Sequence, residues 1–269
     1  MRVYTDLAAE AHALWKYTVA KTSALPGVIA REHSEAGFTI ETIAITDSRG
    51  AETLKKPIGN YVSITLDGKT TNAADVIAAA IGRLAPLETC TRVLIAGLGN
   101  PEVTCDSLGA LALDGVIVTR HLIAADADKD FQTLRSVAAL RTGVLGMSGI
   151  ETAEIITAVL DSVDPDLLIV IDALASAEAG RICESVQLTD TGLVPGSGTD
   201  SARAKLTPEK LGLPVLAIGI PTMRLTINDE QLGDERFIVT RRDIDSRIRE
   251  LAKVLAGGLN LALHGVMSL

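Results

Sequence analysis

Residues 166–175, which read DLLIVIDALA, decide the fold class of this 269-residue chain. The run Leu167 to Ile171 is continuously apolar, as in a strand that is buried on both faces of a parallel sheet. Three further runs of this kind occur at Arg92 to Ala96, Gly115 to Thr119 and Pro214 to Ile220. Helical periodicity separates them, at Ser107 to Leu113 and at Glu151 to Val163. This alternation predicts an α/β fold with a mostly parallel sheet and helices on both sides.

Other elements flank this core. The sequence predicts helices at Thr5 to Lys21, Asn72 to Leu84 and from about Asp243 onward, and strands at Phe38 to Thr46 and Tyr61 to Leu66. The second of these strands alternates apolar and polar residues, so one of its faces is expected to be wet. We expect a single α/β domain over residues 1–269. Its core spans about 88–222, its N-terminal region (residues 1–87) adds a helix and strands, and its helical tail spans about 237–269.

Composition limits the class of protein. Twenty-five basic and thirty-four acidic residues give a formal charge of −9, without a Lys/Arg run dense enough to neutralise a row of phosphates. Direct nucleic-acid binding is therefore not expected. The longest apolar stretches, such as Leu213 to Met223, contain prolines and fall short of the roughly 20 residues that a membrane helix needs. The N-terminus has no apolar region of a secretory signal, so we expect a cytoplasmic protein without a membrane partner.

Two aspartates stand where buried strands end. Residues 97–106, GLGNPEVTCD, form a glycine-rich turn that leaves one strand and delivers Asp106 to a helix start. Asp172 ends the apolar run of another strand in the DLLIVIDALA stretch. Open parallel sheets bind ligands at the carboxyl ends of their strands, where the loops converge. We therefore expect both aspartates to face the same rim of the sheet.

Such a pair of carboxylates is suited to hydrolysis. An ionised carboxylate can take a proton from water, while a protonated one polarises a carbonyl group, and two close like charges favour that division by raising one pKa. Each aspartate taken alone is more readily explained as an ordinary capping residue. The residue pattern by itself leaves the two interpretations open.

Other site chemistries fit the spacing less well. A dinucleotide-binding GxGxxG motif fails at Glu102, and a GxSxG nucleophile elbow fails at Ile150. Ser148 and Ser197 stay as candidates in loops, although turn hydrogen bonding explains both. His121 could approach the rim, alone or as a base for Cys105, but the sequence has no HxxxH or clustered cysteines that would indicate a metal site. The three cysteines are odd in number and widely spaced, which predicts reduced thiols.

A set of motifs from Thr5 to Thr222 resembles one known family. The matching blocks are TDLAAEA, GLGNPEVTCDSLGALAL, VTRHL, GVLGMSGIETAEII, DLLIVIDALAS, VQLTDTGLVPGSG and LGLPVLAIGIPT. Together they are similar to the germination endopeptidases, or spore proteases, of spore-forming bacteria. The tail IVTRRDIDSRIRELAKVLAGGLNLALH also resembles that of the longer-tailed members.

The resemblance implies an atypical aspartic endopeptidase that degrades small acid-soluble spore proteins during germination, without a metal cofactor. It implies that Asp106 and Asp172 are the catalytic residues and that the spore core is the site of action. It also implies a three-layer α/β/α sandwich like that of hydrogenase maturation peptidases, and a homotetramer made as an inactive zymogen. The flanking glycine-rich loops would bind the peptide backbone. Their candidate residues are Gly97, Gly99, Asn100, Gly146, Ser148, Gly196, Ser197 and Gly198.

The chain departs from the family pattern at three places. Only four residues precede Thr5, where family precursors carry a propeptide. Cys105 stands where a proline is common before the catalytic aspartate, and the linker after Thr222 is shortened. Two alternatives remain open: a hydrogenase-maturation-type peptidase, for which His121 would have to supply a metal ligand, and a catalytically silent relative that binds spore proteins.

Overall fold

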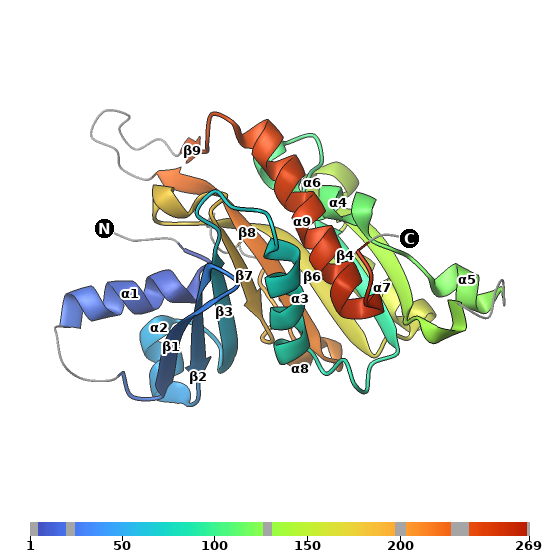
Figure 1. Cartoon of the computed structure of the whole chain (residues 1–269), viewed down its shortest axis with the longest axis horizontal. Coiled ribbons are helices and arrows are strands. Elements are labelled where there is room, and N and C mark those ends of the chain that lie inside the picture. The colour runs from blue at the N-terminus through green and yellow to red at the C-terminus, as the bar shows by residue number, and fades with distance from the viewer. Residues whose placement is uncertain (1–4, 20–24, 126–130, 197–202, 227–236, 268–269) are drawn as a thin grey trace.

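The computed structural model describes residues 5–19, 25–125, 131–196, 203–226 and 237–267. Within these ranges the chain forms one continuous sheet flanked by helices (Figure 1). Its strands lie in the order β1-β2-β3-β7-β8-β6-β4-β5, with β9 paired to β8. This confirms the α/β fold, with strands added on the N-terminal side.

The centre of the sheet is parallel. It consists of β8 (Val215–Thr226), β6 (Leu167–Ala175), β4 (Arg92–Leu98) and β5 (Ser136–Gly143). β6 pairs in parallel with both β8 and β4, and β4 pairs in parallel with β5. The apolar residues of β4 and β6 are buried on both faces, as their uninterrupted hydrophobic runs predict.

The added strands are antiparallel. They are β1 (Val28–Glu35), β2 (Phe38–Ile45), β3 (Gly59–Thr65), β7 (Ser185–Thr189) and β9 (Phe237–Val239). Their pairings with one another and with β8 are all antiparallel. The expected parallel arrangement therefore holds for β8, β6, β4 and β5, while the added strands pair in the antiparallel orientation.

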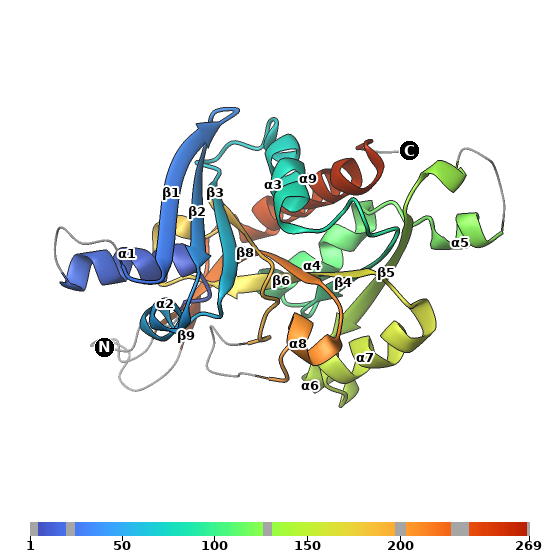
Figure 2. The same ribbon diagram turned by 90° about the horizontal axis from the view of Figure 1, so that it is seen from below.

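Helices cover both faces of the sheet and make three layers (Figures 1 and 2). On one face α3 (Ala73–Leu84), α4 (Leu108–Ala112) and α9 (Ile244–His264) pack in the largest hydrophobic cluster. On the other face α7 (Thr152–Val163) packs against β4 and β6. Figure 2 shows α3 and α9 on the opposite side of the sheet from α7. Such layering gives the α/β/α sandwich.

The remaining helices are short or lie at the N-terminal end of the sheet. α1 (Ala8–Val19) and α2 (Ser48–Leu54) pack against β2, beside the β1–β2 hairpin. The short helices are α5 (Arg120–Ala124), α6 (Leu145–Ser148) and α8 (Pro208–Leu211). Four 3₁₀ turns occur in the described ranges: η1 (Thr104–Asp106), η2 (Leu113–Gly115), η3 (Phe131–Thr133) and η4 (Ala179–Arg181).

One predicted strand is absent. Gly115 to Thr119 forms no strand ladder, and the side chain of Asn260 in α9 binds its backbone in place of a neighbouring strand. The Asn260 Oδ1 accepts from the Ile117 N–H at 2.9 Å, and its Nδ2 donates to the Gly115 carbonyl oxygen at 2.8 Å. The strand next to β4 is instead β5, which the sequence did not reveal because polar residues interrupt its apolar ones.

Three smaller predictions also change. The first helix begins at Ala8 rather than Thr5, because Thr5 and Asp6 lie outside the helix and bind other segments. Asn72 precedes α3 in a left-handed conformation, and its side chain makes no capping hydrogen bond. Ser63, expected on a wet face of β3, is buried and accepts a hydrogen bond from Gln187 of β7 at 2.8 Å. Within the described ranges, the helices are too short or too polar to cross a bilayer.

Candidate active site

The carboxyl ends of β4 and β6 bring the two predicted aspartates to one rim of the sheet. Gly97 near the end of β4 pairs with Ile171 of β6, so Asp172 comes directly after the segment of β6 that pairs with β4. Asp106 closes η1 in the loop that leaves β4. Because neighbouring parallel strands send their following loops to the same edge, residues far apart in the sequence meet here.

Asp106 is held by its own loop. Its Oδ2 accepts a hydrogen bond from the backbone N–H of Asn100 at 2.8 Å. The turn between them requires Gly99, whose φ of +97° is readily adopted only by glycine. From β8, the fully buried Thr222 donates its hydroxyl to the carbonyl oxygen of Cys105 at 2.5 Å. The loop is thus tied to β4 at one end and to β8 at the other.

Asp172 is a buried carboxyl group, with 9 % of its surface exposed. Its Oδ1 accepts the backbone N–H of the next residue, Ala173, at 2.9 Å. That N–H lies beyond the point where β4 stops pairing with β6. The carboxyl therefore occupies the open edge of β6, on the side from which the Asp106 loop approaches.

Both aspartates line one cavity of about 460 Å³. This volume is within the range of small-molecule and cofactor sites. Much of the wall is apolar, with contributions from Leu98, Val103, Val144, Leu193, Met223 and Ile238. The charged side chains of its wall are those of Asp6, Lys55, Lys56, Asp106, Asp172 and Arg203.

Burial gives the two carboxyl groups unequal affinities for a proton. Burial raises the pKa of Asp172 well above its ordinary value, and the negative charges of Asp106 and Asp6 raise it further. Burial also raises the pKa of Asp106, but the Asn100 N–H and the positive charge of Arg203 act in the opposite direction. Asp172 therefore keeps its proton to a higher pH than Asp106. The arrangement can hold one carboxylate and one carboxylic acid at the same time.

Several residues of the site escaped sequence reasoning. Asp6, Lys56 and Arg203 also line the cavity. Asp6 was hidden because Thr5-Asp6 has the appearance of a helix start, and Lys56 and Arg203 lie in segments with no motif. The one available signal for Asp6 was the TDLAAEA block that contains it. This block accompanies the two aspartate blocks in the family resemblance.

The glycine-rich loops are placed differently from one another. Gly99 and Gly196 line the cavity, whereas Gly97, Asn100, Gly146 and Ser148 do not. Gly97 is a packing position, because a Cβ there would lie 2.3 Å from the Gly109 carbonyl oxygen. Gly146 and Ser148 are exposed, and the Ser148 hydroxyl bonds Ile150 within its own turn. Ser197 and Gly198 lie outside the described residues.

His121 and Cys105 are not brought together. His121 lies exposed on α5 and is not part of the cavity wall, whereas Cys105 lines it. Burial raises the pKa of the Cys105 thiol, and the charge of Asp106 raises it further, which disfavours the thiolate that a nucleophile requires. In the part of the chain that the structure describes, His, Cys, Asp and Glu side chains form no group of three suited to a metal ion.

Comparison with known proteins identifies relatives over almost the whole chain. The family model described as germination protease matches residues 6–229. The germination protease of Caldanaerobacter subterraneus subsp. tengcongensis is 36 % identical, covering 97 % of this chain and 94 % of the relative. That of Clostridium perfringens is 32 % identical, covering 99 % and 97 %. That of Bacillus cereus is 36 % identical, covering 97 % and 94 %.

Among solved structures, the [NiFe] hydrogenase maturation protease HycI from Thermococcus kodakarensis matches with a TM-score of 0.39 and 20 % sequence identity. The match covers 67 % of this chain and 99 % of that chain.

Proposed function

The chain belongs to the germination protease family, and from that premise we propose that it cleaves small acid-soluble spore proteins, using Asp106 and Asp172 to activate a water molecule. As a member of this family it is a peptidase that acts on a protein substrate. The observation that carries the mechanism is the pair of carboxyl groups with unequal proton affinities at one cavity.

In the proposed reaction Asp106 is the general base. Its carboxylate takes a proton from a water molecule, and the water oxygen attacks the carbonyl carbon of the scissile peptide bond. Asp172, which holds its proton, transfers it to the carbonyl oxygen, so a neutral tetrahedral intermediate forms. When the intermediate collapses, Asp106 passes its proton to the leaving amide nitrogen and Asp172 takes back a proton from the hydroxyl group. The proton count is balanced, and each carboxyl group returns to its starting state.

The surroundings support this assignment of roles. The Asn100 N–H donates to Asp106 and stabilises its ionised form. Asp172 accepts one backbone N–H through Oδ1, which leaves its second oxygen to carry the proton. Gly196 lines the cavity without a side chain, so a substrate backbone can approach the wall closely there. We extend the proposal to action in the spore core and to assembly as a homotetramer made as a zymogen, on the basis of family membership.

The test is cleavage of a purified small acid-soluble spore protein by the wild type and by Asp106→Asn and Asp172→Asn. Both variants keep the shape of the side chain, and we expect kcat/KM to fall by at least about 10²-fold in each. Asp75→Asn is the matched control, because Asp75 is exposed in the first turn of α3 and is not part of the cavity wall. Thermal unfolding and circular dichroism show whether each variant is folded.

Three outcomes are informative. Cleavage at the wild-type rate by both folded aspartate variants would refute the two-aspartate mechanism. Co-elution of the spore protein with the wild type, without fragments, would indicate a silent binding protein instead of an enzyme. Loss of cleavage on replacing His121 would favour the hydrogenase-maturation-type alternative, in which that residue supplies a metal ligand.

A further inference from the structure

One row of paired residues crosses the sheet at the level of Asp172. Asp172 of β6 is paired with Gly219 of β8, and Gly219 is paired in turn with Gln187 of β7. The row continues to Ser63 of β3. Residues that lie directly opposite one another on neighbouring strands have their side chains on the same face of the sheet. Asp172 and Gln187 therefore stand on one face, two strands apart, and both line the cavity.

The strand between these two side chains has a low, apolar surface. Gly219 has no side chain of its own, and the side chain of Leu174 lies over it: a Cβ on residue 219 would be 2.6 Å from the Leu174 Cγ. Ala217 is the preceding residue of β8 on this face, and it lines the cavity together with Leu174. The cavity thus has an apolar floor over β8, with Asp172 on one side and Gln187 on the other.

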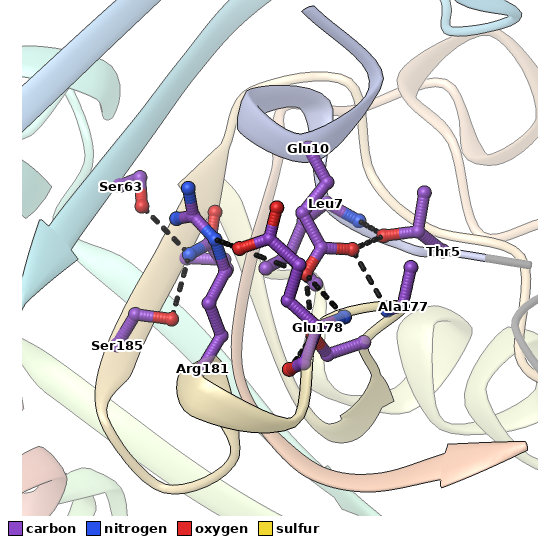
Figure 3. A network of polar contacts seen from close by, with 10 residues as sticks. Thr5, Leu7, Glu10, Ser63, Ala177, Glu178, Arg181 and Ser185 are labelled. Carbon is purple, nitrogen blue, oxygen red and sulfur yellow. Dashed lines mark hydrogen bonds and ion pairs between the residues drawn. The ribbon is translucent and has the colours of Figure 1, made fainter. Parts of the chain in front are cut away.

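The side chain of Gln187 is held in place by two serines. Its Nε2 donates to the Ser63 hydroxyl at 2.8 Å and to the Ser185 hydroxyl at 3.2 Å, and Figure 3 shows both serine side chains turned toward one nitrogen. Both serines are buried. The two bonds use both hydrogens of the amide nitrogen. In the part of the chain that the structure describes, Oε1 accepts no hydrogen bond and is accessible to solvent. It is a fixed acceptor at the cavity wall.

The distance across the floor suits one extended peptide. Neighbouring strands lie about 4.7–4.9 Å apart, so two spacings separate the backbones of β6 and β7 by roughly 10 Å. A strand occupies the same width between two hydrogen-bonded neighbours. Successive residues of an extended chain direct their backbone groups to opposite sides. A substrate segment over β8 can therefore present a carbonyl group to Asp172 and a backbone N–H to Gln187.

We propose that Gln187 is a substrate-binding residue whose Oε1 accepts a backbone N–H of an extended substrate segment, which lies over β8 between Gln187 and Asp172. The inference deepens the proposed function and rests on it for the position of the scissile bond. Every residue except proline has a backbone N–H, so this contact holds the substrate without selecting its sequence. It makes the antiparallel strand β7 part of the binding site.

The test measures binding in the Asp106→Asn variant, in which cleavage is expected to be lost. Synthetic peptides span one cut that the wild type makes in a small acid-soluble spore protein, and each peptide has one N-methylated amide. Methylation at one position, within about three residues of the cut, should raise Kd about fivefold to tenfold, the size of one lost hydrogen bond. When Gln187→Met is added to Asp106→Asn, the same methylation should leave Kd nearly unchanged, because the acceptor is gone.

Two further variants separate binding from folding. Gln187→Met leaves two buried serine hydroxyls without their partner, which costs stability. If that variant does not fold, Ser63→Ala and Ser185→Ala are added to it, because removing all the partners of a buried hydrogen bond costs less than removing one. Gln187→Glu keeps an oxygen acceptor, to which both serine hydroxyls can donate. It should retain the effect of methylation. Asp75→Asn is the control and should bind every peptide as its parent does.

The outcomes distinguish this inference from the proposed function. An effect of methylation that disappears with Gln187→Met and persists with Gln187→Glu supports the role of Gln187. An equal effect with and without Gln187→Met overturns that role and leaves the two-aspartate mechanism intact. Cleavage by Asp106→Asn at the wild-type rate refutes the mechanism instead. In that case the same peptides, used as competitive inhibitors of cleavage, decide the role of Gln187 by the same comparison.

Discussion

A Cβ atom on residue 99 would lie 1.9 Å from the carbonyl oxygen of Asp106. This contact, far shorter than any two such atoms tolerate, makes the path of the loop depend on the absence of a side chain at Gly99. The N–H of Asn100, the next residue, is thereby directed to the Asp106 carboxylate. The orientation of the proposed base is thus set by backbone geometry.

Replacing Gly99 by alanine should therefore displace Asp106. The positive φ alone costs roughly 1 kcal/mol, and the clash forces the loop to move. A displacement of about 1 Å of a catalytic group reduces rates on the order of 10²-fold. We expect kcat to fall by that amount while the protein stays folded, as measured by cleavage kinetics beside thermal unfolding. Gly146→Ala, at an exposed position with open space around its Cβ, is the control and should retain full activity.

The buried acid Asp172 makes stability depend on pH in a defined direction. Its pKa is raised in the folded state, so the folded protein binds more protons than the unfolded chain between the unfolded and folded pKa values. The contribution of Asp172 to the free energy of unfolding is fully present below its unfolded pKa, about 3.9. It is lost as the pH rises through its folded pKa.

Asp172→Asn removes this titration, so the variant should gain Tm relative to the wild type as the pH is raised. Each kcal/mol corresponds to about 2–4 °C for a chain of this size. Calorimetric scans from acidic to alkaline pH measure the difference between the two proteins. A difference in Tm that stays constant with pH contradicts the raised pKa.

Thr222→Val tests whether β8 supports the Asp106 loop. Valine has the same shape but cannot donate to the Cys105 carbonyl oxygen. The loss leaves a carbonyl unpaired, and we expect a cost of about 1–3 kcal/mol in the free energy of unfolding. Because the loop carries Asp106, kcat should fall more than KM rises. Denaturant unfolding and steady-state kinetics separate the two effects. An unchanged kcat with reduced stability would mean that Thr222 contributes to the fold alone.

Cys105→Ala distinguishes an aspartate mechanism from a thiol mechanism. Burial and the neighbouring charge raise the pKa of this thiol, and His121 is not part of the cavity wall from which a base would have to act. The alanine variant should keep kcat/KM within about threefold of the wild type, because the thiol takes no part in the proposed reaction. A threefold change corresponds to about 0.6 kcal/mol in the activation free energy. Loss of more than about 10²-fold, the usual size of a missing acid or base, would assign the chemistry to the thiol.

The elements that were predictable are those whose residues are buried on all sides. β4, β6 and β8 have apolar residues at consecutive positions, which few surroundings other than the middle of an α/β sheet accommodate. α7 and α9 have a clear apolar stripe. β1 and β5 escaped because they are edge strands with charged or polar residues on their open faces, and such segments resemble loops in sequence.

The arrangement of the aspartates was predictable in part. The alternation of strands and helices predicted parallel strands but not their order in the sheet. Parallel orientation suffices to place Asp106 and Asp172 at one rim, because parallel neighbours present their carboxyl ends together. Nothing local in the chain indicated that Asp6 would lie beside Ala175, or that Asn260 would bind Gly115 in place of a strand. Each of those contacts joins residues more than 100 positions apart.

The sequence by itself determined the buried strands β4, β6 and β8, the helices α7 and α9, and the positions of Asp106 and Asp172 after the apolar runs of β4 and β6, because these properties depend on the pattern of neighbours along the chain. The tertiary structure alone decided that Asp172 is buried more deeply than Asp106, that the Asn100 N–H and Arg203 act on Asp106, and that Asp6 binds the backbone of Ala175 in β6. Proton affinity depends on burial and on the charges within a few ångströms. Arg203 and Asp6 come from segments that only folding brings to the aspartates, and the Asn100 N–H is directed at Asp106 by the fold of their own loop.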